Sequence, residues 1–98
     1  MAVDSAKPKL LARVQIGHEV VSITNGNDAP WNSPTVILND AFNGAILEIA
    51  GVWTPGEKKE LQLKEFRGRM NRQAFKPDFE SVKEVIIDAK GFQLGIYK

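Results

Sequence analysis

Turn-forming residues divide this chain into short segments at regular intervals, and this spacing limits the fold more than any other feature. Gly, Pro, Asn and Asp gather at Asn25–Asp28, Ser33-Pro34, Asn43-Gly44, Pro55-Gly56 and Lys90-Gly91. Glycine adopts positive φ without steric cost, and Asn and Asp tolerate it, so each cluster predicts a turn. Turns that recur roughly every 8–12 residues are typical of an all-β sandwich or barrel.

The segments between these turns are apolar or alternate between apolar and polar residues, which is the pattern of β-strands. Strands are therefore predicted at Leu10–Ile16, Glu19–Thr24, Thr35–Asn39, Ala45–Trp53, Lys59–Leu63, Val82–Ala89 and Phe92–Tyr97. We expect an all-β fold, an immunoglobulin-like antiparallel β-sandwich of about seven to eight strands.

The segment from Gly56 to Met70 also fits a helix, because it is rich in Lys, Glu and Arg. Leu61 and Leu63 nevertheless alternate with polar neighbours, as in a strand. Pro55-Gly56 before them predicts a type II turn, with the glycine at positive φ. The strand interpretation is therefore favoured over the helix.

The chain has 98 residues, which is the length of one domain. We expect residues 1–9 to form a flexible N-terminal segment and residues 10–98 to form a single β-sandwich. Apolar residues make up 43% and charged residues 26%, as in ordinary soluble domains. The predicted core consists of Leu10, Ala12, Val14, Ile16, Val21, Ile23, Val36, Leu38, Ile46, Leu61, Leu63, Phe66, Val85 and Ile87.

The chain contains no cysteine, which excludes disulfides, thiolate metal sites and cysteine nucleophiles. Its core must therefore hold the fold without covalent cross-links. No stretch approaches the ~18 consecutive apolar residues of a membrane-spanning helix, so no membrane span is predicted.

Several short motifs within residues 20–90 occur in an order that resembles a known family pattern. They are Ile23-Thr24-Asn25 followed by Trp31, Val36-x-Leu38-Asn39, Pro55-Gly56-Glu57, Leu61-x-Leu63, Phe66, Phe75-x-Pro77 and Val85-x-Ile87. In this order they resemble bacterial immunoglobulin-like accessory domains of envelope and secreted proteins, with FxLYD-type domains as distant relatives.

This resemblance implies a non-catalytic binding or interaction module that is located outside the cytoplasm, in the periplasm, at the cell surface or secreted. It implies no catalytic residue and no cofactor. The segment Arg67-Gly68-Arg69-Met70-Asn71-Arg72 departs from the family pattern, in which an acidic, glycine-containing turn follows the phenylalanine. A ligand bound through that loop is therefore not carried over.

Positive charge is concentrated in the second half of the chain. No Lys or Arg occurs between Val14 and Glu57, whereas ten basic and six acidic residues follow from Lys58 onward. The densest run supplies four candidate contacts for a protein or an anionic polymer, which are Arg67, Arg69, Arg72 and Lys76. Phe66 and Phe75 interleave these charges, as in proteins that stack nucleic-acid bases. The net charge of only +1 argues against nucleic acid.

Two tryptophans, Trp31 and Trp53, suggest an alternative function. An exposed indole offers a flat face to a sugar ring, so either residue would suit a carbohydrate-binding module. A buried tryptophan instead removes about 200 Å² from water and stabilises a small domain. Burial of both is the favoured interpretation, and exposure of either one would favour the carbohydrate-binding module.

Residues for catalysis or metal binding are sparse. His18 is the only histidine and lies in a predicted turn, and no serine stands in a nucleophile-elbow motif. Asn27, Asp28, Asn39 and Asp40 carry oxygen atoms that calcium accepts. The same residue types are what turns require, and their spacing matches no EF-hand loop. We therefore predict no metal site and no enzyme activity.

An open sandwich leaves unpaired strands at the edges of its sheets. The run Val82–Ala89 is sufficiently apolar to pair with a strand of another chain. A dimer through this edge is therefore one of the partnerships that the sequence allows, beside binding to a different protein, an anionic polymer or a carbohydrate.

Overall fold

The alternating segments form antiparallel β-strands, as their period of two residues predicts. The computed structural model describes residues 7–39, 44–68, 73, 75 and 82–97. The strands in these residues are β1 (Ala12–Ile16), β2 (Val20–Asn25), β3 (Trp31–Asn32), β4 (Thr35–Leu38), β5 (Ala45–Glu48), β6 (Val52–Trp53), β7 (Lys58–Gln62), β8 (Arg67–Gly68), β9 (Val85–Asp88) and β10 (Gly95–Tyr97). Every strand pair among them is antiparallel, so the predicted all-β class is confirmed.

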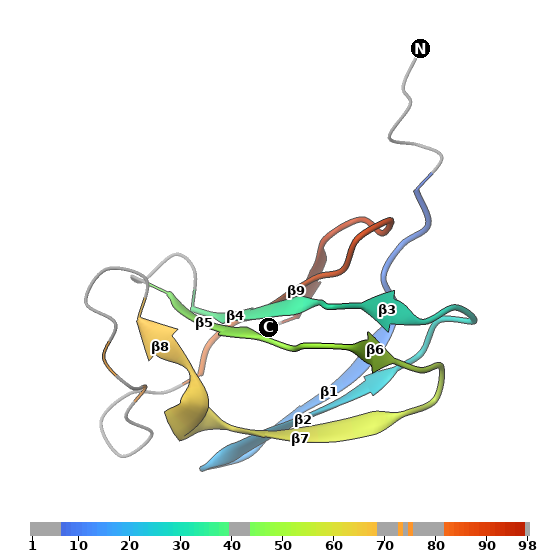
Figure 1. Cartoon of the computed structure of the whole chain (residues 1–98). Helices are drawn as coiled ribbons and strands as arrows, with labels where there is room; N and C mark the ends of the chain where they lie inside the picture. The colour runs from blue at the N-terminus through green and yellow to red at the C-terminus, as the bar shows by residue number, and fades with distance from the viewer. Residues whose placement is uncertain (1–6, 40–43, 69–72, 74, 76–81, 98) are drawn as a thin grey trace.

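Two sheets face each other, as Figure 1 shows, and the hydrophobic core lies between them. One sheet has three strands in the order β1-β2-β7, and the other has five in the order β10-β9-β4-β5-β8. A further two-stranded ladder, β3-β6, extends the β4–β5 hairpin toward one end of the molecule. This arrangement is consistent with a β-sandwich.

The run Val82–Ala89 does not form an edge, so that prediction is wrong. Its strand, β9, lies between β10 and β4 in the five-stranded sheet. Val85, Ile86 and Ile87 are all buried, although successive side chains of a strand point to opposite faces. A continuous apolar run indicates a strand covered on both faces, and in this sheet such a strand is internal.

The long hairpin that contains β3, β4, β5 and β6 has two halves of unequal length. Val36 pairs with Leu47, and Trp31 pairs with Trp53, so one side spans five residue steps where the other spans six. The ladder is held through this region by hydrogen bonds from Ser33 N–H to Gly51 O at 2.8 Å and from Ile49 N–H to Pro34 O at 2.9 Å. Ser33 adopts a φ of 45° and Gly51 a φ of 90°, and these positive values accommodate the extra residue as a bulge.

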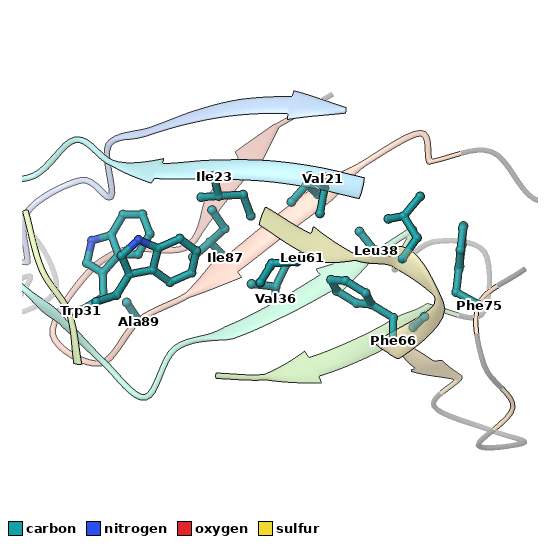
Figure 2. Packing of buried hydrophobic residues seen from close by; sticks show 14 of the residues in the cluster. Val21, Ile23, Trp31, Val36, Leu38, Leu61, Phe66, Phe75, Ile87 and Ala89 are labelled. Atoms are coloured by element: carbon teal, nitrogen blue, oxygen red, sulfur yellow. The ribbon is translucent and has the colours of Figure 1, made fainter. Parts of the chain in front are cut away.

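The core lies between the sheets and draws on both, as Figure 2 shows. Most predicted core residues are buried, namely Leu10, Val21, Ile23, Val36, Leu38, Leu61, Leu63, Phe66, Val85 and Ile87. Ala12 and Val14 are partly buried against them.

Two residues of the predicted core were assigned wrongly. Ile16 is 43% exposed, because it ends β1 just before the turn to β2 and extends past the covered part of the sheet. Ile46 is half-buried and lies outside the core cluster, because Ala45 and Leu47 are the residues of β5 that face inward. An apolar residue at every position of a short strand does not reveal which face is covered.

The predicted turn at Pro55-Gly56 is confirmed. Glu57 N–H donates to Thr54 O at 3.0 Å, and Gly56 has a φ of 79°, as the third position of a type II turn requires. Strand β7 follows, and only a single 3-10 turn, Leu63–Glu65, succeeds it, so the strand interpretation is confirmed over the helix. In the part of the chain that the structure describes, no helix is long and apolar enough to span a membrane.

Residues 7–10 run beside the end of the chain. Gln93 N–H donates to Pro8 O at 3.0 Å, and the Gln93 side-chain amide donates to Lys7 O at 2.9 Å. The Tyr97 hydroxyl donates to Leu10 O at 3.0 Å, which joins the edge of one sheet to the start of the other. Residues 1–6 lie outside the described residues, so the flexible segment expected at 1–9 stays a prediction.

Candidate functional site

The two tryptophans form a cross-strand pair at one end of the core. Trp31 of β3 faces Trp53 of β6 in register, with ring centroids 5.0 Å apart and planes inclined at 63°. Both side chains are completely buried, so the interpretation that places them in the core is confirmed. The carbohydrate-binding alternative depends on an exposed tryptophan. The structure contradicts this exposure for both residues, because the bulged hairpin turns both rings inward.

A buried asparagine, Asn25, holds the loop that follows it against this end of the core. Its side chain is 1% exposed, and its Nδ2 donates to Trp53 O at 2.9 Å and to Ala29 O at 3.1 Å. Its Oδ1 accepts the Asn27 N–H at 2.8 Å. The motif in which Asn25 precedes a polar loop and a tryptophan is therefore explained by internal hydrogen bonds.

Both indole N–H groups are also satisfied within the protein. Trp31 Nε1 donates to Asn27 Oδ1 at 3.0 Å, and Trp53 Nε1 donates to Glu57 O at 2.8 Å. Asn27 Oδ1 accepts the Leu11 N–H as well, at 2.9 Å. Among the described residues, no buried side-chain nitrogen or oxygen lacks a partner. The described polar groups at this end of the sandwich therefore form hydrogen bonds within the protein itself.

The turn at Glu57 lies beside Trp53, whose indole N–H it accepts. The Glu57 carboxylate accepts the Thr54 N–H at 2.9 Å and the Thr54 hydroxyl at 3.1 Å, and it pairs with Lys59 Nζ at 3.2 Å. The hydrogen bond from the Thr54 N–H, followed by that from Lys59, lowers the pKa of Glu57 below its ordinary value. Lys59 Nζ lies 5.7 Å from the centre of the Trp53 ring. The Pro55-Gly56-Glu57 motif thus has a structural role, because its turn is held by hydrogen bonds and an ion pair beside Trp53.

Only part of the predicted basic surface lies within the described residues. Arg67 is exposed on β8, and its guanidinium donates to Lys64 O at 3.0 Å. The other three predicted contacts, Arg69, Arg72 and Lys76, lie outside the described residues, so their role in binding stays a prediction.

The two phenylalanines among these charges are core residues. Phe66 is completely buried, Phe75 is 5% exposed, and the Phe75 N–H donates to Phe66 O at 2.9 Å. Neither ring faces solvent for stacking on a nucleic-acid base, so the feature that suggested nucleic acid has a structural explanation.

The residues considered for metal binding or catalysis serve turns where they are described. Asn39 adopts a φ of 51°, and its Oδ1 accepts the N–H groups of Lys83 at 2.6 Å and Glu84 at 3.1 Å. Asp40 lies outside the described residues. His18 is exposed at the β1–β2 turn. Within the described ranges, no three His, Cys, Asp or Glu side chains are grouped as a metal would require.

A groove opens between β1 and β10, where the two sheets meet at their edges. It has a volume of about 410 Å³ and is lined by Lys9, Leu10, Leu11, Ala12, Gln93, Leu94, Gly95, Ile96 and Tyr97. Three apolar residues of this lining are more than half exposed, namely Leu11 at 54%, Leu94 at 57% and Ile96 at 56%. Burial raises the pKa of Tyr97, whose hydroxyl closes the base of the groove against Leu10 O.

Sequence reasoning missed this groove because its two sides come from opposite ends of the chain. Tyr97 and Leu10 are 87 residues apart in sequence yet share a hydrogen bond. The alternation of Leu94, Gly95 and Ile96 indicates that Leu94 and Ile96 share a face. It does not indicate that Ile96 lies on the edge strand of a sheet, with Leu94 just before that strand, and this position leaves both side chains in water.

The groove combines exposed apolar side chains with strand edges, which is the character of a surface that binds another polypeptide. Comparisons of the chain with protein-family models, curated proteins and solved structures give no match. The resemblance to bacterial immunoglobulin-like accessory domains therefore stays a prediction, and the groove is the feature of the described residues from which a function can be inferred.

Proposed function

We propose that this chain is a non-catalytic binding module with an immunoglobulin-like sandwich fold, which engages a protein partner through the groove between β1 and β10. In keeping with the family resemblance, the proposal places it as an accessory domain of a bacterial envelope or secreted protein. The observation that carries the proposal is the cluster of Leu11, Leu94 and Ile96, each more than half exposed along one groove.

The order of the strands supports the immunoglobulin-like part of this proposal. Immunoglobulin sandwiches place strands A, B and E in one sheet and strands G, F, C and C′ in the other. Counting β1 as A, β2 as B, β4 as C, β5 as C′, β7 as E, β9 as F and β10 as G gives the orders A-B-E and G-F-C-C′, while β8, which pairs with β5 at the end of the second sheet, has no counterpart in this assignment. In this assignment the groove lies between strands A and G, at the open side of the sandwich.

The way in which the polar residues are used supports a non-catalytic role. Asn25, Asn27, Asn39 and Glu57 carry side-chain oxygens that a ligand or reaction would use, and in each residue one such oxygen accepts a backbone N–H of the chain itself. Catalytic groups must instead point at a substrate. The apolar groove offers surface for binding rather than groups for chemistry.

The proposal is tested with a displayed library of random peptides of roughly twelve residues, selected on the immobilised domain. Selected peptides are then measured against the double variant Leu94→Lys/Ile96→Lys. We expect selection to yield peptides whose binding is lost on this variant, because two charges interrupt the apolar rim. Val52→Lys is the matched control, since Val52 is 55% exposed on β6 and lies outside the groove.

Peptides that bind the wild-type domain and both variants equally would place the binding surface elsewhere. A selection that yields no peptide above background would remove the protein-binding proposal itself. Circular dichroism of each variant establishes that lost binding does not reflect lost structure.

A further inference from the structure

We infer that the partner in the groove is an extended peptide segment that joins the five-stranded sheet as a new edge strand beside β10, with apolar residues at alternate positions and an acidic residue at the end that lies toward Lys7 and Lys9. This inference rests on the proposed function and names the class of ligand and the way it is bound.

The backbone of β10 is the first observation that supports strand addition. In the described part of the chain, β10 is the last strand of its sheet and pairs only with β9. In an antiparallel pair, alternate residues direct their N–H and C=O groups away from the partner strand. Beyond Gln93, whose N–H already donates to Pro8 O, the outer side of β10 therefore presents backbone groups that an added strand can satisfy, as in β-strand addition.

The other three edges of the two large sheets carry charge, and β10 does not. Edge strands of natural proteins are commonly protected from pairing by charged side chains, lysine above all. Strand β7 carries Lys58, Lys59 and Glu60, β1 carries Arg13, and β8 begins with Arg67. Gly95, Ile96 and Tyr97 of β10 include no charged side chain. This edge therefore lacks the protection that the other three edges have.

The outer face of the five-stranded sheet indicates what the new strand would place beside Ile96. The pairings Ile96–Ile86, Ile86–Ile37 and Ile37–Ile46 form one cross-strand row of isoleucines. Ile96 ends this row and is the most exposed of the four at 56%, whereas Ile86 is 8% exposed. A β-branched residue opposite Ile96 would extend the row and cover it, since cross-strand apolar pairs stabilise sheets.

The inner side of the groove receives the alternate residues of the added strand. Leu11, 54% exposed, and partly buried Ala12 line this side. Gly95 brings β10 close to Leu10, since a Cβ built on it would lie 2.8 Å from Leu10 Cδ2. The groove is therefore shallow at Gly95, and small or medium apolar side chains suit it.

The charges beside the groove favour an acidic residue at one end of the peptide. Lys9 is the charged residue among the described lining of the groove, and Lys7 lies next to it in the exposed segment that holds Gln93. Asp88, the acidic residue of the neighbouring strand β9, is exposed and lies one residue beyond Ile87, which pairs with Gly95. An acidic residue of the peptide is therefore favoured toward Lys7 and Lys9, and apolar residues are favoured on the outer surface.

The inference is tested with a synthetic peptide of roughly nine residues in which isoleucine alternates with threonine and glutamate stands at both ends. Titration of the isotope-labelled domain, followed by nuclear magnetic resonance, reports shifts and hydrogen exchange for each amide. We expect slower exchange at the outward-facing amides of Gly95–Tyr97. Replacing the central residue of the peptide by proline removes a donor and should abolish this protection.

The charge requirement has a separate measurement. A matched peptide with lysine in place of both glutamates should bind about threefold to tenfold more weakly at low salt. The difference between the two peptides should shrink as salt screens the exposed charges. Equal binding of both peptides would overturn the acidic part of the inference.

Two outcomes would overturn strand addition while leaving a binding module in place. One is a library-selected peptide that requires Leu94 and Ile96 but leaves exchange at Gly95–Tyr97 unchanged. The other is a dimer of the domain alone in sedimentation that Ile96→Lys dissociates, which would make a second copy the occupant of the edge. We expect the domain alone to sediment as a monomer, and Val52→Lys to behave as wild type in every assay.

Discussion

Two regions of the molecule differ in how far their apolar side chains are buried: the end of the sandwich that contains Trp31 and Trp53, and the groove between β1 and β10. At the first, Trp31 and Trp53 are completely buried and Asn25 makes three hydrogen bonds. At the second, Leu94 and Ile96 stand more than half in water beside an unprotected strand edge. One region is closed by its own residues, and the other is left open.

This difference separates stability from binding within a small domain. Burying large apolar side chains with their polar groups satisfied stabilises a fold, whereas apolar groups left in water do not. We therefore expect substitutions at the closed end to change the free energy of unfolding, and substitutions at the groove to change binding.

Trp31→Ala should lower the free energy of unfolding by about 3–5 kcal/mol, because it leaves a large cavity beside Trp53. Urea denaturation followed by circular dichroism measures the loss. Trp31→Phe keeps most of the ring contact and should lose distinctly less. A loss below about 1 kcal/mol for the alanine variant would mean that this end of the sandwich contributes little to stability.

Asn25→Ala should cost about 1–3 kcal/mol, because it leaves buried partners of the amide without hydrogen bonds. These partners are Trp53 O, Ala29 O and the Asn27 N–H. Asn32→Ala, at an exposed position of β3, is the control and should leave the urea midpoint unchanged. Equal midpoints for both variants would show that the buried network is dispensable.

In the Glu57→Gln variant, the free energy of unfolding should decrease less steeply as the pH falls into the acid range than it does in the wild type. The pKa of Glu57 is lowered in the folded protein, so its contribution is complete above the unfolded-state pKa and disappears as the pH falls through the folded-state pKa. Thermal unfolding midpoints recorded from neutral pH into acid should therefore fall more steeply for wild type. Glu60→Gln, at an exposed position of β7, is the comparison, and equally steep curves for wild type and Glu57→Gln would contradict the structural role of the Glu57 carboxylate.

Leu94→Lys should change the free energy of unfolding by less than about 0.5 kcal/mol, because the side chain is already largely in water. The same urea series measures it, with Val52→Lys as a second exposed position. A loss comparable to that of Asn25→Ala would mean that the groove supports the fold, and the separation of the two regions would be refuted.

Local patterns in the sequence predicted where most strands lie, but not which face of each strand is buried or which strands lie at a sheet edge. Seven predicted strands correspond to β1, β2, β4, β5 with β6, β7, β9 and β10. The two-residue strands β3 and β8 were missed because two residues have no period. Ile46 was misplaced because its neighbours Ala45 and Leu47 are also apolar, so alternation left the inward face undecided.

The groove required information that no local pattern contains. Whether a strand is central or at an edge depends on pairing between distant segments, such as Tyr97 with Leu10. The exposed tryptophan platform was wrong for a related reason. Trp31 and Trp53 are turned inward by a bulge whose signals, Ser33 and Gly51, are common turn residues in any sequence.

The unequal hairpin that carries Trp31 and Trp53 also has a consequence for folding. A strand that slips by one residue exchanges its two faces, and a regular ladder does little to prevent this. Here the extra residue lets both halves of the hairpin form hydrogen bonds in a single alignment, with Ser33 opposite Gly51. The left-handed backbone of Ser33 costs about 1–2 kcal/mol. A hairpin slipped by one residue would lose the hydrogen bonds on one side of the bulge, and this disfavours alignments that would turn the indoles outward.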